Sequence, residues 1–157
     1  MLKPKLRALF EEYDDSHRHP TNRLTHVIAI PMIVFHIIAM LSWIPLGTVG
    51  GLHLTVAHLA FAGAVGWYLS LNLRLGLIMA VLYAACFPLA AITPWPVVVG
   101  IAVVGWVIQL LGHVVWEKRS PAFLRNLLQA LVGPLFFVAK RTGDWPEQRQ
   151  LEQAAAP

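Results

Sequence analysis

Charged side chains are scarce in this sequence. Asp, Glu, Lys and Arg make up 13% of its 157 residues, whereas soluble domains carry about 25%. Between residues 24 and 116 the one residue of these four types is Arg74, and 57% of the whole chain is hydrophobic. This shortage of charge excludes an ordinary soluble domain, and we expect one integral membrane domain with a polar segment at each end.

The sequence also has a single cysteine, and it lacks the residue patterns that are typical of nucleic-acid-binding proteins. The single Cys86 excludes an internal disulfide. The net charge of +4 comes from the two ends of the chain, and no array of basic and aromatic residues accompanies it. We therefore expect no nucleic-acid partner, and the positive ends suit an anionic membrane surface or the anionic head of a substrate.

Four apolar segments fill the middle of the chain, each close to the length of about 20 residues that crosses a bilayer as a helix. The links between them contain Pro, Gly and Asn, and links this short favour antiparallel neighbours. The predicted fold class is therefore all-α, an integral membrane bundle of four transmembrane helices. The predicted spans are residues 24–44, 52–71, 75–92 and 96–116.

The basic residues of such a bundle all fall on one side of the membrane. They precede the first span, follow the fourth, and include Arg74 between the second and the third. The positive-inside rule then places both termini in the cytoplasm.

Both ends of the chain are predicted to carry a further helix. Apolar residues recur at helical spacing between residues 2 and 13, with charges on the other faces, which indicates an N-terminal amphipathic helix. Residues 121–140 are apolar but are interrupted by Arg, Asn, Gln and Gly-Pro, which favours a C-terminal interfacial or re-entrant helix over a fifth span. We predict a single domain over residues 1–143, followed by a polar tail over residues 144–157.

Polar residues of the last span fall on one face of its helix. Gln109, His113 and Glu117 recur at intervals of four, which places them one above the other. All three lie near the end of the span that is predicted to face the cytoplasm, where polar groups at membrane depth are costly and usually functional.

The start of the first span carries matching residues at the same membrane face. Asn22 and His26 are also four residues apart, and a turn near Pro20 would bring His17 back toward His26. The predicted site has His17, His26 and His113 as metal ligands, Glu117 as a fourth ligand or a base beside them, and Asn22 as a second catalytic candidate.

The remaining histidines are predicted to lie outside this site. His19 is expected in a solvated loop and His53 at the opposite membrane face, about 30 Å away. His36 and His58 lie inside the first two spans, where a hydrogen bond between helices is the expected role.

The predicted ligand set leaves several chemistries open. Two or three histidines with a carboxylate and an open position are typical of non-heme Fe(II) oxygenases, but zinc hydrolases use similar sets. A bis-histidine heme protein that uses His26 and His113 is one alternative, and a non-enzymatic membrane scaffold is another. A di-iron hydroxylase is disfavoured, because the chain has no His-x-x-x-His or His-x-x-His-His box.

The two polar motifs also resemble those of a known family. His17-x4-Asn22-x3-His26 followed by Pro31, together with Gly112-His113-x3-Glu117-x3-Pro121-Ala122, is similar to the fungal 2-hydroxy fatty acid dioxygenases and their bacterial relatives. The resemblance spans nearly the whole chain, and it departs from the family pattern at Ala29, where glycine is expected before Ile-Pro.

That resemblance implies an Fe(II)-dependent enzyme of the bilayer that shortens long-chain 2-hydroxy fatty acids by one carbon with O2. The expected cofactor is Fe(2+), and the expected location is the inner membrane of a bacterium. The substrate would chelate iron through its hydroxyl and carboxylate, with its alkyl chain between the spans. Arg18, Arg23 and Lys118 are the candidates for attracting the carboxylate, and the sequence does not choose among them.

Overall fold

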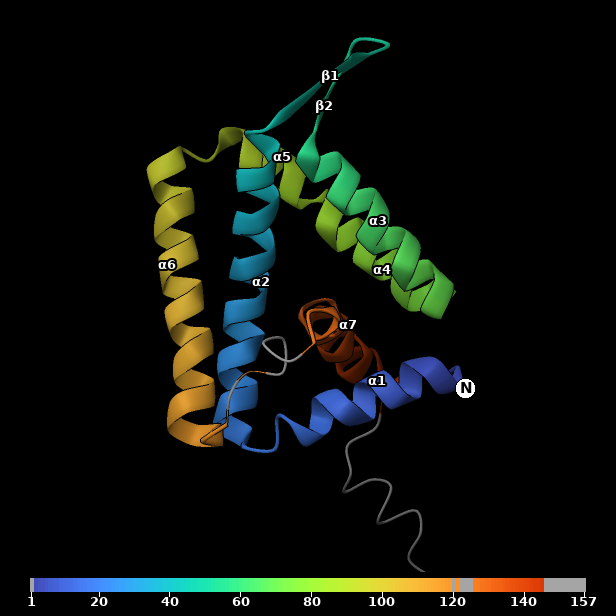
Figure 1. Cartoon of the computed structure of the whole chain (residues 1–157), viewed down its shortest axis with the longest axis vertical. Coiled ribbons are helices and arrows are strands. Elements are labelled where there is room, and N and C mark those ends of the chain that lie inside the picture. The colour runs from blue at the N-terminus through green and yellow to red at the C-terminus, as the bar shows by residue number, and fades with distance from the viewer. Residues whose placement is uncertain (1, 120, 122–125, 146–157) are drawn as a thin grey trace, which may run out of the picture.

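The computed structural model describes residues 2–119, 121 and 126–145, and it is helical apart from one small hairpin (Figure 1). This confirms the predicted helical class in outline. The elements are α1 (Pro4–Asp15), α2 (Pro20–Ser42), β1 (Pro45–Val49), β2 (Leu52–Thr55), α3 (Val56–Leu71), α4 (Leu73–Ala84), α5 (Cys86–Ile92), α6 (Trp95–Leu111), the π-helical turn η1 (Gly112–Glu117) and α7 (Leu128–Thr142).

Helices α2 and α6 lie side by side and run in opposite directions (Figure 1). Their close approach depends on Gly105, because a Cβ there would lie 3.1 Å from Met32 Cβ. Helix α6 continues into η1, and the wider π turn occurs where the helix reaches the start of α2. Single π turns often occur at functional sites.

Among the described residues, the helical segments long and apolar enough to cross a membrane are Pro20–Ser42, Leu73–Ile92 and Trp95–Glu117. The second predicted span, residues 52–71, does not reach that length. Its helix, α3, has 16 residues and is therefore about 24 Å long, whereas the hydrocarbon core is about 30 Å thick. The prediction of four spans is therefore not confirmed, and the observed architecture has three candidate membrane-spanning helices.

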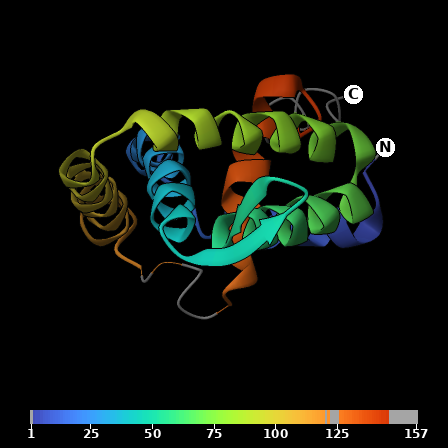
Figure 2. The same cartoon turned by 90° about the horizontal axis from the view of Figure 1, so that it is seen from above.

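The shortened α3 reflects a hairpin that the sequence interpretation missed. The segment expected to start a helix at Leu52 forms β2, which pairs with β1 in an antiparallel hairpin seen from above in Figure 2. Gly50 and Gly51 adopt the positive φ angles that this turn requires, and Gly47 adopts one at the irregular pairing within β1. Helix α3 begins only after Thr55, where the Thr55 and His58 side chains form a capping box.

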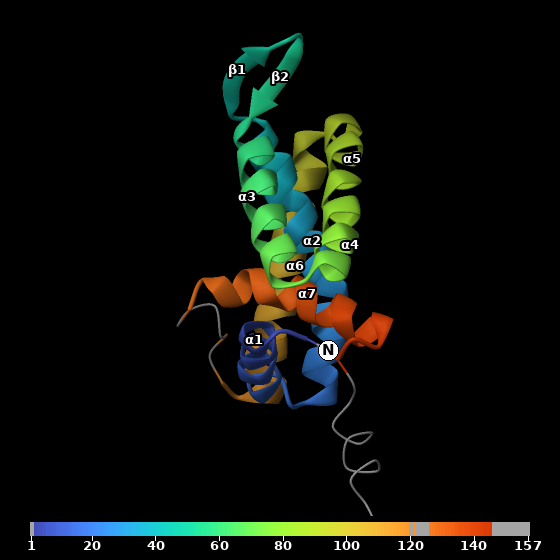
Figure 3. The same cartoon turned by 90° about the vertical axis from the view of Figure 1, so that its right-hand side faces the viewer.

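Helices occur at both predicted terminal positions, and they pack against each other. Helix α7 runs across the ends of α3 and α4, and α1 lies below it (Figure 3). Phe10 of α1 meets Phe136 of α7 edge-on at 5.5 Å between ring centroids, and Trp145 meets Phe10 at the same distance. The apolar face of α1 is thus largely covered by α7, and an interfacial position for either helix stays a prediction.

The turn between α3 and α4 lies at the same end of the molecule as α1 and α7. Arg74 in the first turn of α4 pairs with Asp144 at 2.8 Å, and Lys3 donates to the Ser70 carbonyl. Basic residues from the middle of the chain and from near its two termini therefore lie at the same end of the molecule. Of the predicted tail, only Asp144 and Trp145 are among the described residues, so the boundary at 143 and the cytoplasmic orientation stay predictions.

Candidate metal centre

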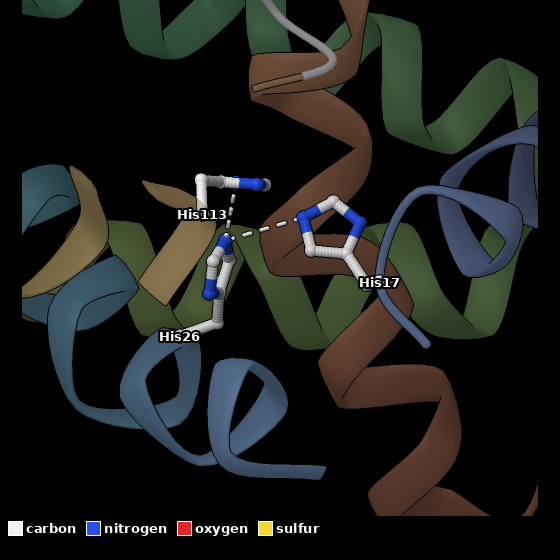
Figure 4. Close-up of side chains that lie close together, drawn as sticks. All are labelled: His17, His26 and His113. Carbon is white, nitrogen blue, oxygen red and sulfur yellow. Dashed lines mark hydrogen bonds between the residues drawn. The ribbon is translucent and has the colours of Figure 1, made fainter. Parts of the chain in front are cut away.

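Three histidine side chains from distant parts of the chain meet in the interior (Figure 4). His17 follows α1, His26 lies near the start of α2, and His113 lies in η1. Nε2 of His26 lies 3.2 Å from Nε2 of His17 and 3.0 Å from Nε2 of His113. Each side chain is at most 1% exposed. The structure thus brings together the three residues that were predicted to be metal ligands.

Hydrogen bonds on the far side of two rings fix which nitrogens carry hydrogen. Nδ1 of His17 lies 2.7 Å from the Tyr13 carbonyl oxygen, and Nδ1 of His26 lies 2.7 Å from the Asn22 carbonyl oxygen. A carbonyl only accepts, so both Nδ1 atoms donate, and the neutral rings present lone pairs at Nε2. Two lone pairs therefore face each other at 3.2 Å. Backbone carbonyls orient metal-binding histidines in the same way.

The surroundings of His17 keep its ring neutral. Burial lowers the pKa of His17 to about 3, and the nearby His113 and Arg23 also lower it. The ring stacks on Tyr13 at 3.9 Å between centroids. Burial raises the pKa of Tyr13, so its phenol stays protonated. A neutral imidazole is the form that binds a metal. Its nitrogen normally lies about 2.1 Å from an ion such as zinc.

The donor set fits a metal ion. Nε2 of His26 lies 3.0 Å from that of His113 and 3.2 Å from that of His17. Two ligand nitrogens that bind one ion at right angles, each about 2.1 Å from it, are about 3 Å apart, so these distances match. The amide Nε2 of Gln109 lies 2.7 Å from Nε2 of His26. Gln109 therefore lies beside the cluster, as its spacing from His113 predicted.

Glu117 is not part of the cluster, and its carboxylate contacts the segment that follows His17. Its carboxylate accepts from the backbone N–H groups of Arg18 and His19 at 2.9 and 3.0 Å, and from the Asn22 amide at 3.0 Å. Three donors thus hold the end of η1 to the turn before α2. This geometry favours the predicted role beside the ligands over a role as fourth ligand.

Asn22 connects Glu117 to the cluster. Its amide donates to Glu117, and its backbone carbonyl accepts from His26 Nδ1. The side chain is fully buried, and Oδ1 faces Gly112, where an added Cβ would overlap it. Asn22 therefore positions two site residues, and its predicted catalytic role stays a prediction.

A largely apolar cavity of about 220 Å³ opens from the cluster. His17 and His113 form part of its wall, and α2, α3, α6 and α7 supply most of the rest. Along α2 the wall extends from Ile30 to Leu41, a length of about 16 Å at 1.5 Å per residue. The cavity therefore suits a long apolar molecule with its polar end at the histidines.

The other histidines lie outside the cluster. His53 contacts Thr48 in the hairpin at 3.0 Å, and His19 caps α2 by accepting from the Thr21 N–H. The interhelical hydrogen bond expected of His36 is confirmed, but the one expected of His58 is not. His36 accepts from Trp106 Nε1 at 3.3 Å, because α2 packs on α6 there, whereas His58 caps its own helix.

Tyr13 and Gln129 are two of the cavity residues that were not predicted as site residues. Tyr13 was interpreted as part of an amphipathic face, and Gln129 as a polar interruption of an apolar segment. A glutamine within an apolar helix is the one signal that would have identified Gln129, because such groups are costly to bury without a partner.

Comparison with known proteins agrees with this geometry. Residues 4–144 match the family described as 2-hydroxy-palmitic acid dioxygenase Mpo1-like. The chain is 30% identical over 133 residues to the 2-hydroxy-palmitic acid dioxygenase MPO1 of Saccharomyces cerevisiae, covering 85% of this chain and 76% of the yeast protein. No solved structure matches the chain. The match over nearly the whole chain confirms the resemblance seen in the two motifs, and this protein belongs to the Mpo1-like family.

Proposed function

We propose that this chain is an Fe(II)-dependent dioxygenase that shortens long-chain 2-hydroxy fatty acids by one carbon with O2. The observation that carries this proposal is the buried cluster of three histidine nitrogens at one end of an apolar cavity. The yeast relative is a 2-hydroxy-palmitic acid dioxygenase by name, which supports the same substrate class. The membrane-length apolar helices suit a substrate that is delivered from a bilayer.

His17, His26 and His113 would hold the iron. Bound iron would supply the redox chemistry with O2 that protein side chains lack, and a Lewis acid for the substrate hydroxyl and carboxylate. The Tyr13 and Asn22 carbonyls orient two of the rings, so the chain holds these lone pairs in place before any ion arrives. Three protein ligands leave positions for a substrate and for O2.

The cavity wall determines how the substrate lies. Isoleucine, valine and leucine side chains of α2 cover one side of it, and Ala60, Phe61 and Ala64 of α3 cover another. Burial of an alkyl chain against such a wall contributes about 0.8 kcal/mol per CH2 group. The same wall excludes water from the reacting end, which strengthens the polar contacts made there.

Elemental analysis and an activity assay on the purified protein test the proposal. We expect iron near one equivalent per chain and conversion of 2-hydroxypalmitate, in the presence of O2, to a fatty acid one carbon shorter. A heme protein would show a Soret absorption band, a zinc enzyme would contain zinc in place of iron, and a scaffold would contain no stoichiometric metal. Any of these three results, without conversion of the acid, would refute the proposal.

Replacing Glu117 by Gln separates its two predicted roles. The variant keeps the size of the side chain but faces the Arg18 and His19 N–H groups with a neutral amide. If Glu117 positions the segment that carries His17, we expect bound iron to stay close to the wild-type amount. Turnover should then fall by about 10- to 100-fold, the usual size of effect for a group that orients metal ligands.

The matched control is Glu11→Gln, because Glu11 is an exposed carboxylate that pairs with Arg7 on α1. That variant should keep both its iron and its activity, since an exposed ion pair contributes little. Loss of iron in the Glu117 variant, with unchanged helix content, would instead show that Glu117 is a ligand.

A further inference from the structure

The strongest unexplained group in the described residues is the amide of Gln129. This side chain comes from the first turn of α7, lines the cavity, and is 2% exposed. Within the part of the chain that the structure describes, neither its Oε1 nor its Nε2 has a hydrogen-bond partner. A buried amide without a partner destabilises the folded protein, so it normally has a function.

Beside the proposed iron, the described residues of the cavity offer no basic side chain that would receive a carboxylate. Among the described residues, none that lines it is Lys or Arg. Two of the basic residues considered earlier are engaged elsewhere: the Arg23 side chain donates to the His17 carbonyl and pairs with Asp14, and the exposed Arg18 pairs with Asp15. An acid that enters this cavity therefore meets neutral donors.

Gln129 lies on the face of α7 that lines the cavity, which His17 and His113 also line. Gly133, one turn further along, also lines the cavity, and a Cβ at Gly133 would lie 3.0 Å from Tyr13 Oη. Tyr13 in turn stacks on His17. Residues four apart on a helix share a face, so Gln129 and the histidines face one cavity from different elements.

We propose that Gln129 recognises the polar head of the 2-hydroxy fatty acid. Its Nε2 donates to the substrate carboxylate, and its Oε1 accepts from the 2-hydroxyl. One amide provides both a donor and an acceptor, and the acceptor distinguishes a 2-hydroxy acid from an acid without the hydroxyl. This assignment rests on the proposed function, since it names the group that selects the substrate of that site.

Replacing Gln129 by Met tests the assignment, because Met has similar length and no amide. With the iron-containing protein we expect KM for 2-hydroxypalmitate to rise about 10- to 100-fold, as for loss of a hydrogen bond to a charged group. We expect kcat to change less, the preference for 2-hydroxypalmitate over palmitate in binding to fall, and bound iron to stay constant. Without substrate, the thermal midpoint should rise, because an unpartnered buried amide is removed.

A second variant keeps the test decisive if the Met variant folds poorly. Gln129→Glu keeps the shape and places a carboxylate opposite the substrate carboxylate, so it should weaken binding of 2-hydroxypalmitate more than binding of its methyl ester. Leu128→Met, at the exposed neighbouring position of α7, is the control for substitution in this turn and should leave binding unchanged.

The outcomes separate this assignment from the proposed function. If the wild-type protein binds and converts 2-hydroxypalmitate but the Met and Glu variants keep its KM and its preference over palmitate, Gln129 is a structural residue and the assignment is wrong. If the wild-type protein neither binds nor converts the acid, both the assignment and the proposed function are wrong.

Discussion

Replacing His26 by Ala should remove most of the iron and the ability to shorten 2-hydroxypalmitate. Its Nε2 atom lies 3.2 Å from Nε2 of His17 and 3.0 Å from Nε2 of His113, the other two proposed ligands. Alanine supplies no donor, and loss of one of three ligands should weaken iron binding well beyond the 10- to 100-fold typical of residues that only orient ligands. Iron per folded chain after purification and product formation measure the effect. His17→Ala and His113→Ala should behave alike.

His53→Ala is the matched control for the His26 substitution. His53 lies in the exposed hairpin, where it contacts Thr48, and it is not part of the cluster. This variant should therefore keep its iron and its activity. Full iron content and full activity in the His26 and His113 variants would refute the metal centre, and the family likeness would then reflect a shared fold without shared chemistry.

Replacing Gly112 by Ala should have the second-largest effect, although the substitution adds a single methyl group. A Cβ at Gly112 would overlap Thr25 Oγ1 and Asn22 Oδ1 across the contact between η1 and α2. To admit it, either the Thr25 and Asn22 side chains shift, which disturbs the contact of Asn22 with Glu117, or the two elements separate, which moves His113 away from His26. Overpacking of this kind costs about 1 to 3 kcal/mol of folding free energy. We expect a lower thermal midpoint and a loss of iron and turnover of at least about tenfold, because site geometry tolerates little displacement.

Gly100→Ala provides the comparison within the same segment. Gly100 lies in α6, and no atom approaches within 4 Å of an added Cβ. Alanine there should stabilise the helix by up to about 1 kcal/mol, because it has the higher helix propensity. If Gly112→Ala retains wild-type iron, activity and thermal midpoint, then close approach of η1 to α2 is not required for the site.

The sequence alone was sufficient to predict the helical class and the grouping of His17, His26 and His113. Helical periodicity relates His113 to Gln109 and Glu117, and two long apolar segments that run in opposite directions bring their polar ends to one face. The polar turn before Pro20 then returns His17 to His26. These inferences succeeded because each depends on local spacing or on the length of an apolar segment.

The tertiary structure decided which groups the other residues of the site contact. Glu117 meets the N–H groups of Arg18 and His19, which lie 99 and 98 residues away in the sequence, and Gln129 reaches the cavity because α7 crosses the other helices. Helix α3 is shorter than predicted because the preceding residues form the β1–β2 hairpin. The positive φ angles of three glycines favour this hairpin over a helix, although the segment is apolar. Local periodicity fixes which face of a helix is polar. Which partner meets that face depends on packing between residues that are distant in the sequence, and in this protein that packing decides which groups Glu117 and Gln129 contact.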